Sequence, residues 1–147
     1  MAFQKEPLYL HGQAAKTAVL YCNLGTPKEP TAPALRQYLA QFLGDSRVVE
    51  IPKAIWWLIL HGIILRIRPA KSAAKYASIW TAEGSPLRVW TEKQALGLAD
   101  KLKSSGHEVA VKYAMTYGQP SIESQLTAFR EEGVTRILML SLIHISE

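Results

Sequence analysis

The fold is decided by the stretch Thr17-Ala-Val-Leu-Tyr-Cys-Asn-Leu-Gly-Thr-Pro27, in which an apolar run breaks into a turn. The run from 17 to 22 predicts a buried strand. Gly25 permits backbone angles that other residues resist, Pro27 fixes the direction in which the chain leaves, and the Asn23 side chain can bridge neighbouring backbone groups. Because small ligands bind at the carboxyl ends of strands in an open parallel sheet, this corner is the first candidate for a binding site.

Outward from this stretch, predicted helices alternate with predicted strands. Apolar residues at helical spacing, together with capping and turn residues, predict helices over 33–43, 53–67, 70–79, 86–105 and 122–132. Apolar runs predict two more strands over 108–115 and 136–140, and the segment 47–51, stopped by Pro52, is expected to be extended. Strands that alternate with helices imply right-handed parallel crossovers. The sequence therefore predicts an α/β fold with a doubly wound parallel sheet.

Composition is that of a globular protein and disfavours export and nucleic-acid binding. The 147 residues are 48% hydrophobic and 20% charged, which suffices for one domain with a sizeable core. The formal net charge is +5, but the Lys and Arg residues are dispersed rather than gathered in one block. Residues 1–7 lack the apolar core of a secretory signal, so we expect a cytoplasmic protein.

Neither the cysteine nor the histidines form a recognisable site. Cys22 lies inside the first predicted strand, so we expect a packed and inert thiol. The histidines lack the short paired spacings of zinc sites and are scattered: His11, His61, His107 and His144. A glycine-rich phosphate loop and a Gly-x-Ser-x-Gly elbow are both absent from the sequence, which disfavours nucleotide hydrolysis and esterase chemistry.

The most apolar stretch of the chain is the segment 54–65, Ala-Ile-Trp-Trp-Leu-Ile-Leu-His-Gly-Ile-Ile-Leu. It is shorter than the roughly twenty residues that a membrane-spanning helix needs, so we expect no crossing. Trp56 and Trp57, followed by the basic residues of 66–71, have the chemistry of a surface that rests on lipid headgroups or closes over a large flat ligand. An ordinary core helix is the alternative, and composition does not separate the two.

The corners of the predicted fold supply the remaining polar chemistry. Hydroxyl groups stand at predicted strand ends and before a predicted helix: Thr26, Ser85, Thr116 and Tyr117. Ser85 precedes Pro86, the arrangement of a helix N-cap followed by a first-turn proline. Arg68 is a cation beside the apolar segment. Such a set suits a flat apolar molecule that carries carboxylates.

Several short motifs occur in an order that is similar to that of a known family. They are Asn23-Leu-Gly-Thr-Pro27, Tyr38-Leu-Ala-Gln-Phe-Leu43, Arg47-Val-Val-Glu-Ile-Pro52, Trp56-Trp57, His61-Gly-Ile-Ile-Leu65, Tyr76-Ala-Ser-Ile-Trp80, Gly84-Ser-Pro86, Met115-Thr-Tyr-Gly118 and Pro120-Ser-Ile122. Together they closely resemble the amino-terminal half of bacterial ferrochelatases. The resemblance implies the chelatase fold, two Rossmann-like lobes with a porphyrin cleft between them. It also implies insertion of ferrous iron into protoporphyrin or coproporphyrin, which forms haem.

The resemblance further implies porphyrin-binding positions, taken residue by residue. Leu24 falls where a side chain of the first corner lies over the porphyrin face. Arg68 and Tyr76 fall where groups near the porphyrin edge and its propionates lie. Ser85 stands where the family has a hydroxyl near a propionate.

Two more positions follow from the resemblance, and the implied roles have packing alternatives. Thr116 and Tyr117 stand where some relatives have Arg or Lys followed by an aromatic residue. Thr116 is neutral, which disfavours an ionic role at that position. Tyr76 packed between helices and Ser85 as a helix cap are the alternatives to ligand contact.

The resemblance assigns no catalytic or metal-binding residue to this chain. Family members carry a metal-handling His and a partner Glu in later segments, and His144 matches neither motif. Ferrous iron is a substrate there, and no tightly bound cofactor is implied. After Leu140 the family continues Pro-Leu-Tyr-Pro-Gln, whereas 141–147 read Ser-Leu-Ile-His-Ile-Ser-Glu, which we interpret as a non-native tail. We expect an extension over 1–15, a partial first lobe over 16–140, and no second lobe.

Two interpretations of function remain open at this point. In the first, the chain is the front half of a ferrochelatase and is inactive alone; in the second, it is a non-catalytic porphyrin-binding or interaction module. A chelatase acting on sirohydrochlorin fits less well, because the paired tryptophans and the stretch 76–80 are more similar to ferrochelatases. The expected partners are a porphyrin, ferrous iron, and a membrane surface contacted through Trp56 and Trp57.

Overall fold

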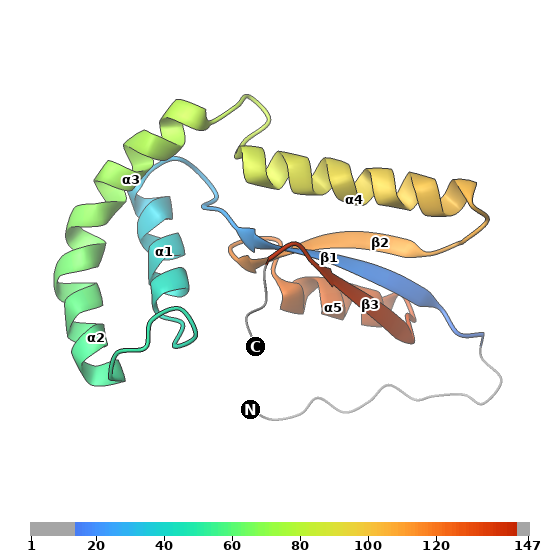
Figure 1. The fold of residues 1–147 in the computed structure, drawn as a ribbon, viewed down its shortest axis with the longest axis horizontal. Helices are drawn as coiled ribbons and strands as arrows, with labels where there is room; N and C mark the ends of the chain where they lie inside the picture. Colours follow the sequence, from blue (N-terminus) through green and yellow to red (C-terminus); the bar gives the residue numbers. More distant parts are fainter. Residues whose placement is uncertain (1–13, 144–147) are drawn as a thin grey trace.

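The computed structural model describes residues 14–143, and Figure 1 shows the course of the chain. The strands are β1 (Thr17–Gly25), β2 (Ala110–Tyr117) and β3 (Arg136–Ser141). The α-helices are α1 (Ala32–Leu43), α2 (Lys53–Ile59), α3 (Leu65–Ile79), α4 (Pro86–Ser104) and α5 (Ile122–Glu131). A π-helical segment, η1 (Leu60–Ile64), lies between α2 and α3.

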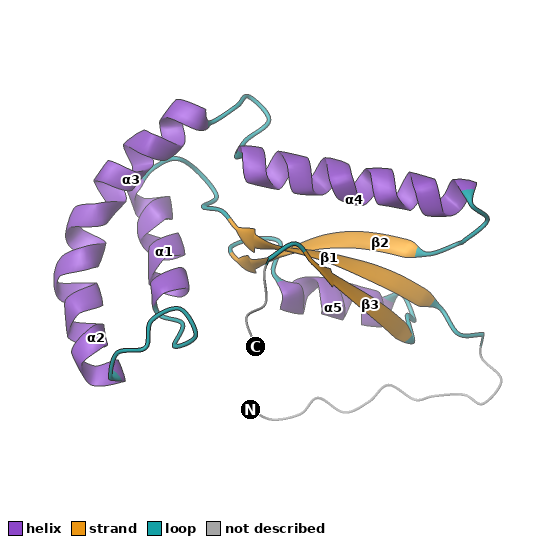
Figure 2. Ribbon diagram, in the orientation of Figure 1, coloured by secondary structure: helices purple, strands orange, loops and turns teal. Residues whose placement is uncertain are grey.

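The strands form one parallel sheet in the order β2-β1-β3 (Figure 2). In the central strand β1, Val19 pairs with Val111 on one side and with Leu138 on the other. The helix α4 lies along one face of the sheet and α5 along the other (Figure 1). A strand covered on both faces is apolar without alternation, which is the pattern of 17–22. The predicted α/β fold with a parallel sheet between helices is confirmed.

The core of the sheet lies between β1 and α5. Ala18, Leu20 and Cys22 alternate along β1, so their side chains share one face. There they pack with Ala114 of β2 and with Phe129 of α5, which is fully buried. Burial raises the pKa of the Cys22 thiol, so the thiol stays protonated at neutral pH. The expected packing of this thiol is confirmed.

A helical layer stands beside the carboxyl ends of the strands, with α1 packed along α3 (Figure 1). Leu35 and Tyr38 of α1 form a buried cluster with Ala73 of α3 and Tyr117 at the end of β2. Leu24, near the end of β1, packs against the same cluster. The cluster therefore fixes the helical layer to the edge of the sheet at which ligand binding is predicted.

The segments α2, η1 and α3 form one continuous helix, so the prediction of separate helices over 53–67 and 70–79 is wrong. The structure is helical from Lys53 to Ile79, with Pro69 inside α3. A proline lacks the N–H that would bond the carbonyl four residues earlier, here that of Leu65. Arg36 of α1 donates a hydrogen bond from Nε to the Leu65 oxygen at 2.9 Å. This tertiary contact satisfies the carbonyl, and the helix continues.

The expected extended stretch over 47–51 is also wrong, because a turn follows α1. The Val48 N–H donates to the Asp45 carbonyl at 3.0 Å, and the Arg47 N–H donates to Asp45 Oδ1 at 2.9 Å. An Asp side chain that accepts a bond from the backbone two residues later stabilises a turn. The hydrogen bond from the Arg47 N–H to the Asp45 side chain therefore favours a turn, although the apolar pattern of 47–51 favours an extended backbone.

The apolar segment 54–65 lies at the surface, so the alternative of an ordinary core helix is wrong. Leu60 and Leu65 are the buried residues of the segment, whereas Trp57 is 60% exposed and Leu58 is 65% exposed. Within 14–143, no helix is both long enough and apolar enough to cross a membrane.

Candidate functional site

The first two strands end side by side, which joins the two corners found in the sequence. Gly25, the last residue of β1, pairs with Tyr117, the last residue of β2, so both strands run further than predicted. Gly25 has a φ of +115°, and a Cβ there would lie 1.7 Å from the Tyr117 carbonyl oxygen. At Gly118, with a φ of +97°, a Cβ would lie 2.7 Å from the Thr26 carbonyl oxygen. Both positions require glycine because the two backbones touch here.

Side-chain hydrogen bonds fix the first corner. The Leu24 N–H donates to Asn23 Oδ1 at 2.8 Å, which confirms the expected bridge from Asn23 to the backbone. Asn23 Nδ2 also donates to Thr91 Oγ1 of α4 at 2.8 Å. The corner is therefore tied to the helix that covers the sheet.

Ser85 stands at the N-cap of α4, as predicted, but its side chain does not cap the helix. Thr26 Oγ1 donates a hydrogen bond to Ser85 Oγ at 2.7 Å, and both residues are buried. The hydroxyl that was expected to accept from the helix backbone is engaged by the first corner instead. Ser85 is thereby placed at the carboxyl edge of the sheet.

A pocket of about 470 Å³ opens at this edge. Three of the residues predicted to bind a porphyrin line it: Leu24, Thr116 and Tyr117. Apolar side chains of α5 and β3, such as Ile122 and Met139, also line it. Arg47, in the turn after α1, is the one charged residue of the lining within the described chain. The pocket thus combines apolar walls with hydroxyls and one cation.

Asp45 connects two residues of this pocket. The Tyr117 hydroxyl donates to Asp45 Oδ2 at 3.0 Å, and the Tyr117 ring meets Phe42 edge to face with centroids 5.1 Å apart. Arg47 donates to the same carboxylate from Nε at 3.1 Å and from Nη2 at 2.6 Å. These bonds from Arg47 hold the pKa of Asp45 well below its usual range, and burial together with Asp45 raises the pKa of Tyr117.

The contribution of Asp45 and Arg47 is absent from the sequence prediction. Arg47 begins a motif that contributed only to the secondary-structure prediction and the family likeness, and Asp45 lies between two of the motifs. The available signal was the order Gly44-Asp45-Ser46-Arg47, in which a helix end precedes an acid and a base two residues apart. Only the fold shows that this turn lies beside Tyr117.

The remaining predicted residues lie on α3. Tyr76 is half-buried against the cluster that contains Tyr38 and Tyr117, and its ring meets that of Trp80 at 6.4 Å. The Tyr38 hydroxyl donates to the Gly25 carbonyl at 3.3 Å, and burial with the neighbouring Tyr76 raises the pKa of Tyr38. Tyr76 is therefore close to the strand ends. Arg68 is exposed and does not line the 470 Å³ pocket.

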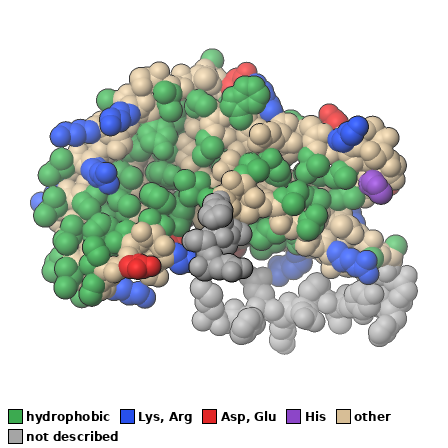
Figure 3. Space-filling model, viewed as in Figure 1, with side chains coloured by type: hydrophobic (Ala, Val, Ile, Leu, Met, Phe, Trp, Pro, Cys, Tyr) green, Lys and Arg blue, Asp and Glu red, His purple; other side chains and the backbone are tan. Residues whose placement is uncertain are grey.

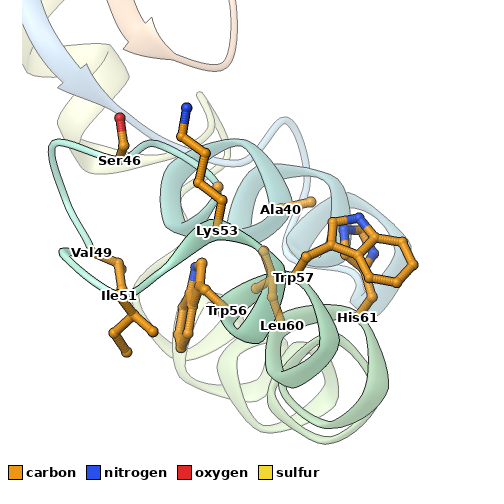
Figure 4. Close-up of a pocket in the computed structure, with 10 residues that line it drawn as sticks. Ala40, Ser46, Val49, Ile51, Lys53, Trp56, Trp57, Leu60 and His61 are labelled. Atoms are coloured by element: carbon orange, nitrogen blue, oxygen red, sulfur yellow. The ribbon is translucent and has the colours of Figure 1, made fainter.

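A second pocket, of about 240 Å³, lies between the end of α1 and the helix that begins with α2 (Figure 4). Trp56 lines it and donates from Nε1 to the Leu43 carbonyl at 2.6 Å, which fixes its ring. Trp57 lies beside His61, with ring centroids 4.9 Å apart. The paired tryptophans thus differ: one is held by hydrogen bonding and the other is exposed.

The surface around this pocket is apolar and basic. Hydrophobic side chains gather over the helical layer, with Lys and Arg side chains among them (Figure 3). The exposed large apolar residues of the continuous helix are Ile55, Trp57, Leu58, Ile63, Ile67 and Ile79. Segment 51–82 contains Lys and Arg but neither Asp nor Glu. The charged side chains of this segment are therefore all positive.

Among residues 14–143, no group of three or more His, Cys, Asp or Glu side chains is placed to hold a metal ion. His61 and His107 lie in this range, and neither belongs to such a group. The predictions for His11, for His144 and for most of the tail and the extension concern residues outside the described part of the chain.

Comparisons with known proteins all lead to one family. The sequence model of the family described as Ferrochelatase matches residues 16–146. A protein named Ferrochelatase from Polaromonas sp. is 65% identical over 144 residues, which cover 95% of this chain and 39% of that protein. A Ferrochelatase from Methylibium petroleiphilum is 63% identical over 142 residues, covering 97% of this chain and 39% of the relative. A Ferrochelatase from Dechloromonas aromatica is 59% identical over 138 residues, which cover 94% of this chain and 38% of that protein.

The similarity therefore extends over nearly the whole chain but only part of each relative. The chain spans 38–39% of the length of these curated relatives. The matched region contains both sheet corners, the 470 Å³ pocket and the helical layer.

Proposed function

Since the chain belongs to the ferrochelatase family, we propose that it forms the porphyrin-binding first lobe of an enzyme that inserts ferrous iron into a porphyrin to form haem. The observation that carries the proposal is the family match over 16–146 together with a pocket at the strand ends that three predicted residues line. Apolar walls beside hydroxyls and a cation suit a flat apolar ligand that carries carboxylates. The reaction class is that of a lyase that forms metal–nitrogen bonds.

The proposed roles follow the positions of the side chains. Leu24, which packs near the end of β1, contacts the porphyrin face. Thr116 and Tyr117 contact the part of the ligand that enters the 470 Å³ pocket. Tyr76 and Ser85 lie near the same strand ends, and we assign them to the porphyrin edge. Arg68, exposed on α3, holds a propionate that extends beyond the pocket.

We propose further that the 147 residues bind porphyrin without inserting iron. Metal insertion needs a base that accepts the pyrrole protons and ligands that guide the iron. The sequence contains no match to the family's metal-handling His and Glu motifs. A non-catalytic porphyrin-binding or interaction module is the alternative function, and iron insertion by this chain, lost in His144→Ala, would contradict the proposal.

We also propose that the apolar and basic surface of the helix from Lys53 to Ile79 makes a peripheral membrane contact on the cytoplasmic side. Trp57 and Leu58 are strongly exposed on a helix whose own charged residues are all Lys or Arg. Exposed aromatic and aliphatic side chains beside Lys and Arg favour the interface of anionic lipids. We expect the chain to bind vesicles that contain phosphatidylglycerol, and Trp57→Ser to weaken this binding. Trp90→Ser, at an exposed tryptophan of α4, is the matched control, and equal loss in both variants would contradict the assignment.

The porphyrin proposal is tested by titrating the chain with protoporphyrin IX and following tryptophan fluorescence. A charge-assisted hydrogen bond to a propionate contributes about 1.5–3 kcal/mol, so Arg68→Ala should weaken binding about tenfold or more. Arg68→Lys should recover part of the loss, because an ammonium lacks the two-pronged contact of a guanidinium. Arg66→Ala removes a neighbouring exposed cation and is the control. Unchanged affinity in Arg68→Ala would remove Arg68 from the site.

A further inference from the structure

The 470 Å³ pocket contains a cation to which neither the sequence nor the family likeness assigns a role. Arg47 lines the pocket beside Thr116 and Tyr117. The residue before Tyr117 at the end of β2 is the neutral Thr116, which also lines the pocket. A carboxylate that enters the pocket therefore meets Arg47 as the one charged side chain of its lining within 14–143.

Arg47 is held in a defined orientation although its side chain is 79% exposed. Its Nε and Nη2 donate to the Asp45 carboxylate, and its own backbone N–H donates to Asp45 Oδ1 at 2.9 Å. Asp45 also accepts from the Tyr117 hydroxyl. One carboxylate thus joins the turn after α1 to the end of β2, with Arg47 and Tyr117 on either side of it.

The guanidinium keeps hydrogen-bonding capacity for a ligand. Arginine carries five N–H donors in a planar fork, and the contacts to Asp45 occupy one edge of it. Nη1 of Arg47 donates to no protein group within the described residues. A guanidinium whose second edge is free binds a second carboxylate in two-pronged geometry.

We propose that Arg47 is a carboxylate-binding residue of this pocket and that Asp45 is the positioning residue that orients Arg47. The inference rests on the proposed function, because it takes the ligand to be a porphyrin that carries carboxylates. It adds a contact at the end of β2, whereas the Arg68 contact lies on α3.

The test uses the full 147-residue chain with protoporphyrin IX and with its dimethyl ester, in which both carboxylates are masked. Arg47→Ala should weaken binding of the diacid about tenfold or more and leave binding of the diester unchanged, and Arg47→Lys should recover part of the loss. Arg136→Ala removes an exposed arginine at the opposite end of the sheet and should change neither affinity. An equal loss for diacid and diester would show that Arg47 supports the fold and would overturn the inference.

The positioning role of Asp45 has a separate readout. Asp45→Asn should weaken diacid binding severalfold, spare the diester, and add little further loss in the Arg47→Ala background, because both changes remove one contact. Additive losses, or loss of diester binding, would overturn the positioning role. If the unaltered chain binds neither porphyrin, the proposed function fails as well. If it prefers the diacid and Arg47→Ala retains that preference in full, the inference alone fails.

Discussion

At the scale of single residues, the site depends on the contact between Gly25 and the Tyr117 carbonyl. The two strands end in register, and their backbones approach so closely that a side chain at Gly25 has no room. The Gly25 carbonyl also accepts from the Tyr38 hydroxyl, which ties α1 to the strand ends. This glycine therefore sets the distance between the two corners that carry the candidate ligand residues.

Gly25→Ala should destabilise the protein by more than about 2 kcal/mol. The new Cβ would meet a backbone oxygen at 1.7 Å, and a φ of +115° is strained for any residue with a side chain. Urea unfolding at equilibrium measures the change. Gly97→Ala is the matched control, because nothing lies within 4 Å of its Cβ position and alanine favours a helix. Similar midpoints for Gly25→Ala and the unaltered chain would contradict the account.

Asp45 should make stability depend on acid pH. Hydrogen bonds from Arg47 lower the pKa of Asp45 in the folded state, so the stabilisation is present above the unfolded-state value of about 4 and is lost as pH falls through the folded-state pKa. Unfolding midpoints of the unaltered chain and of Asp45→Asn should therefore differ at pH 6 and converge as the pH falls below about 4. Asp100→Asn, on the exposed side of α4, is the control. A difference that does not vary with pH would contradict this assignment.

At the level of residues, the sequence predicts contacts between near neighbours in the chain but not contacts between distant ones. Asn23, Gly25 and Ser85 were recognised because turn and capping residues act on their immediate neighbours. The partners of Ser85 and Asp45 lie far along the chain, at Thr26 and Tyr117, and no local pattern encodes those distances. The roles of the six predicted porphyrin contacts stay predictions.

At the scale of elements, the helix from Lys53 to Ile79 shows how tertiary contact overrides a local stop signal. Pro69 is normally a sign that a helix ends or bends, which is why two helices were predicted. The Leu65 carbonyl, left without its helical partner, is bonded by Arg36 from another helix. The existence of β1 was predicted correctly because a strand covered on both faces is a continuous apolar run. The strand β3 was also found from its apolar run, although its residues are exposed in the structure.

The Arg36 contact predicts a coupling between two distant residues. Arg36→Ala should cost about 1–2 kcal/mol, because it leaves a part-buried carbonyl without a donor. In a Pro69→Ala background the helix regains its own N–H for the Leu65 oxygen, so the same change should cost clearly less. Unfolding free energies of the two single variants and the double variant measure this coupling. Strict additivity would show that Arg36 does not replace the missing helical bond.

At the scale of the whole molecule, the sheet is covered unevenly. Every residue of β3 is exposed, including Ile137, Leu138 and Met139, although β3 pairs with β1 throughout. The second edge of β3 pairs with no strand among the described residues. Such an edge with apolar side chains favours association.

The 147-residue chain should therefore bind a hydrophobic dye and self-associate. Leu138→Lys, at a residue that is 55% exposed, should reduce both effects, because a charge on an edge strand opposes further pairing. Leu96→Lys changes a comparably exposed leucine of α4 and is the control. Dye fluorescence and size-exclusion chromatography give the readouts. A monomer with little dye binding would count against this prediction.

The central claim, that this chain is the porphyrin-binding lobe of a ferrochelatase, is tested most directly by a chimera. Residues 16–140 of this chain would replace the corresponding part of the Polaromonas relative, and formation of haem from ferrous iron and protoporphyrin would be measured anaerobically. We predict iron insertion at a rate within about tenfold of that of the unaltered relative, and a strong loss when Gly25→Ala is introduced. A folded, soluble chimera that forms no haem would contradict the claim.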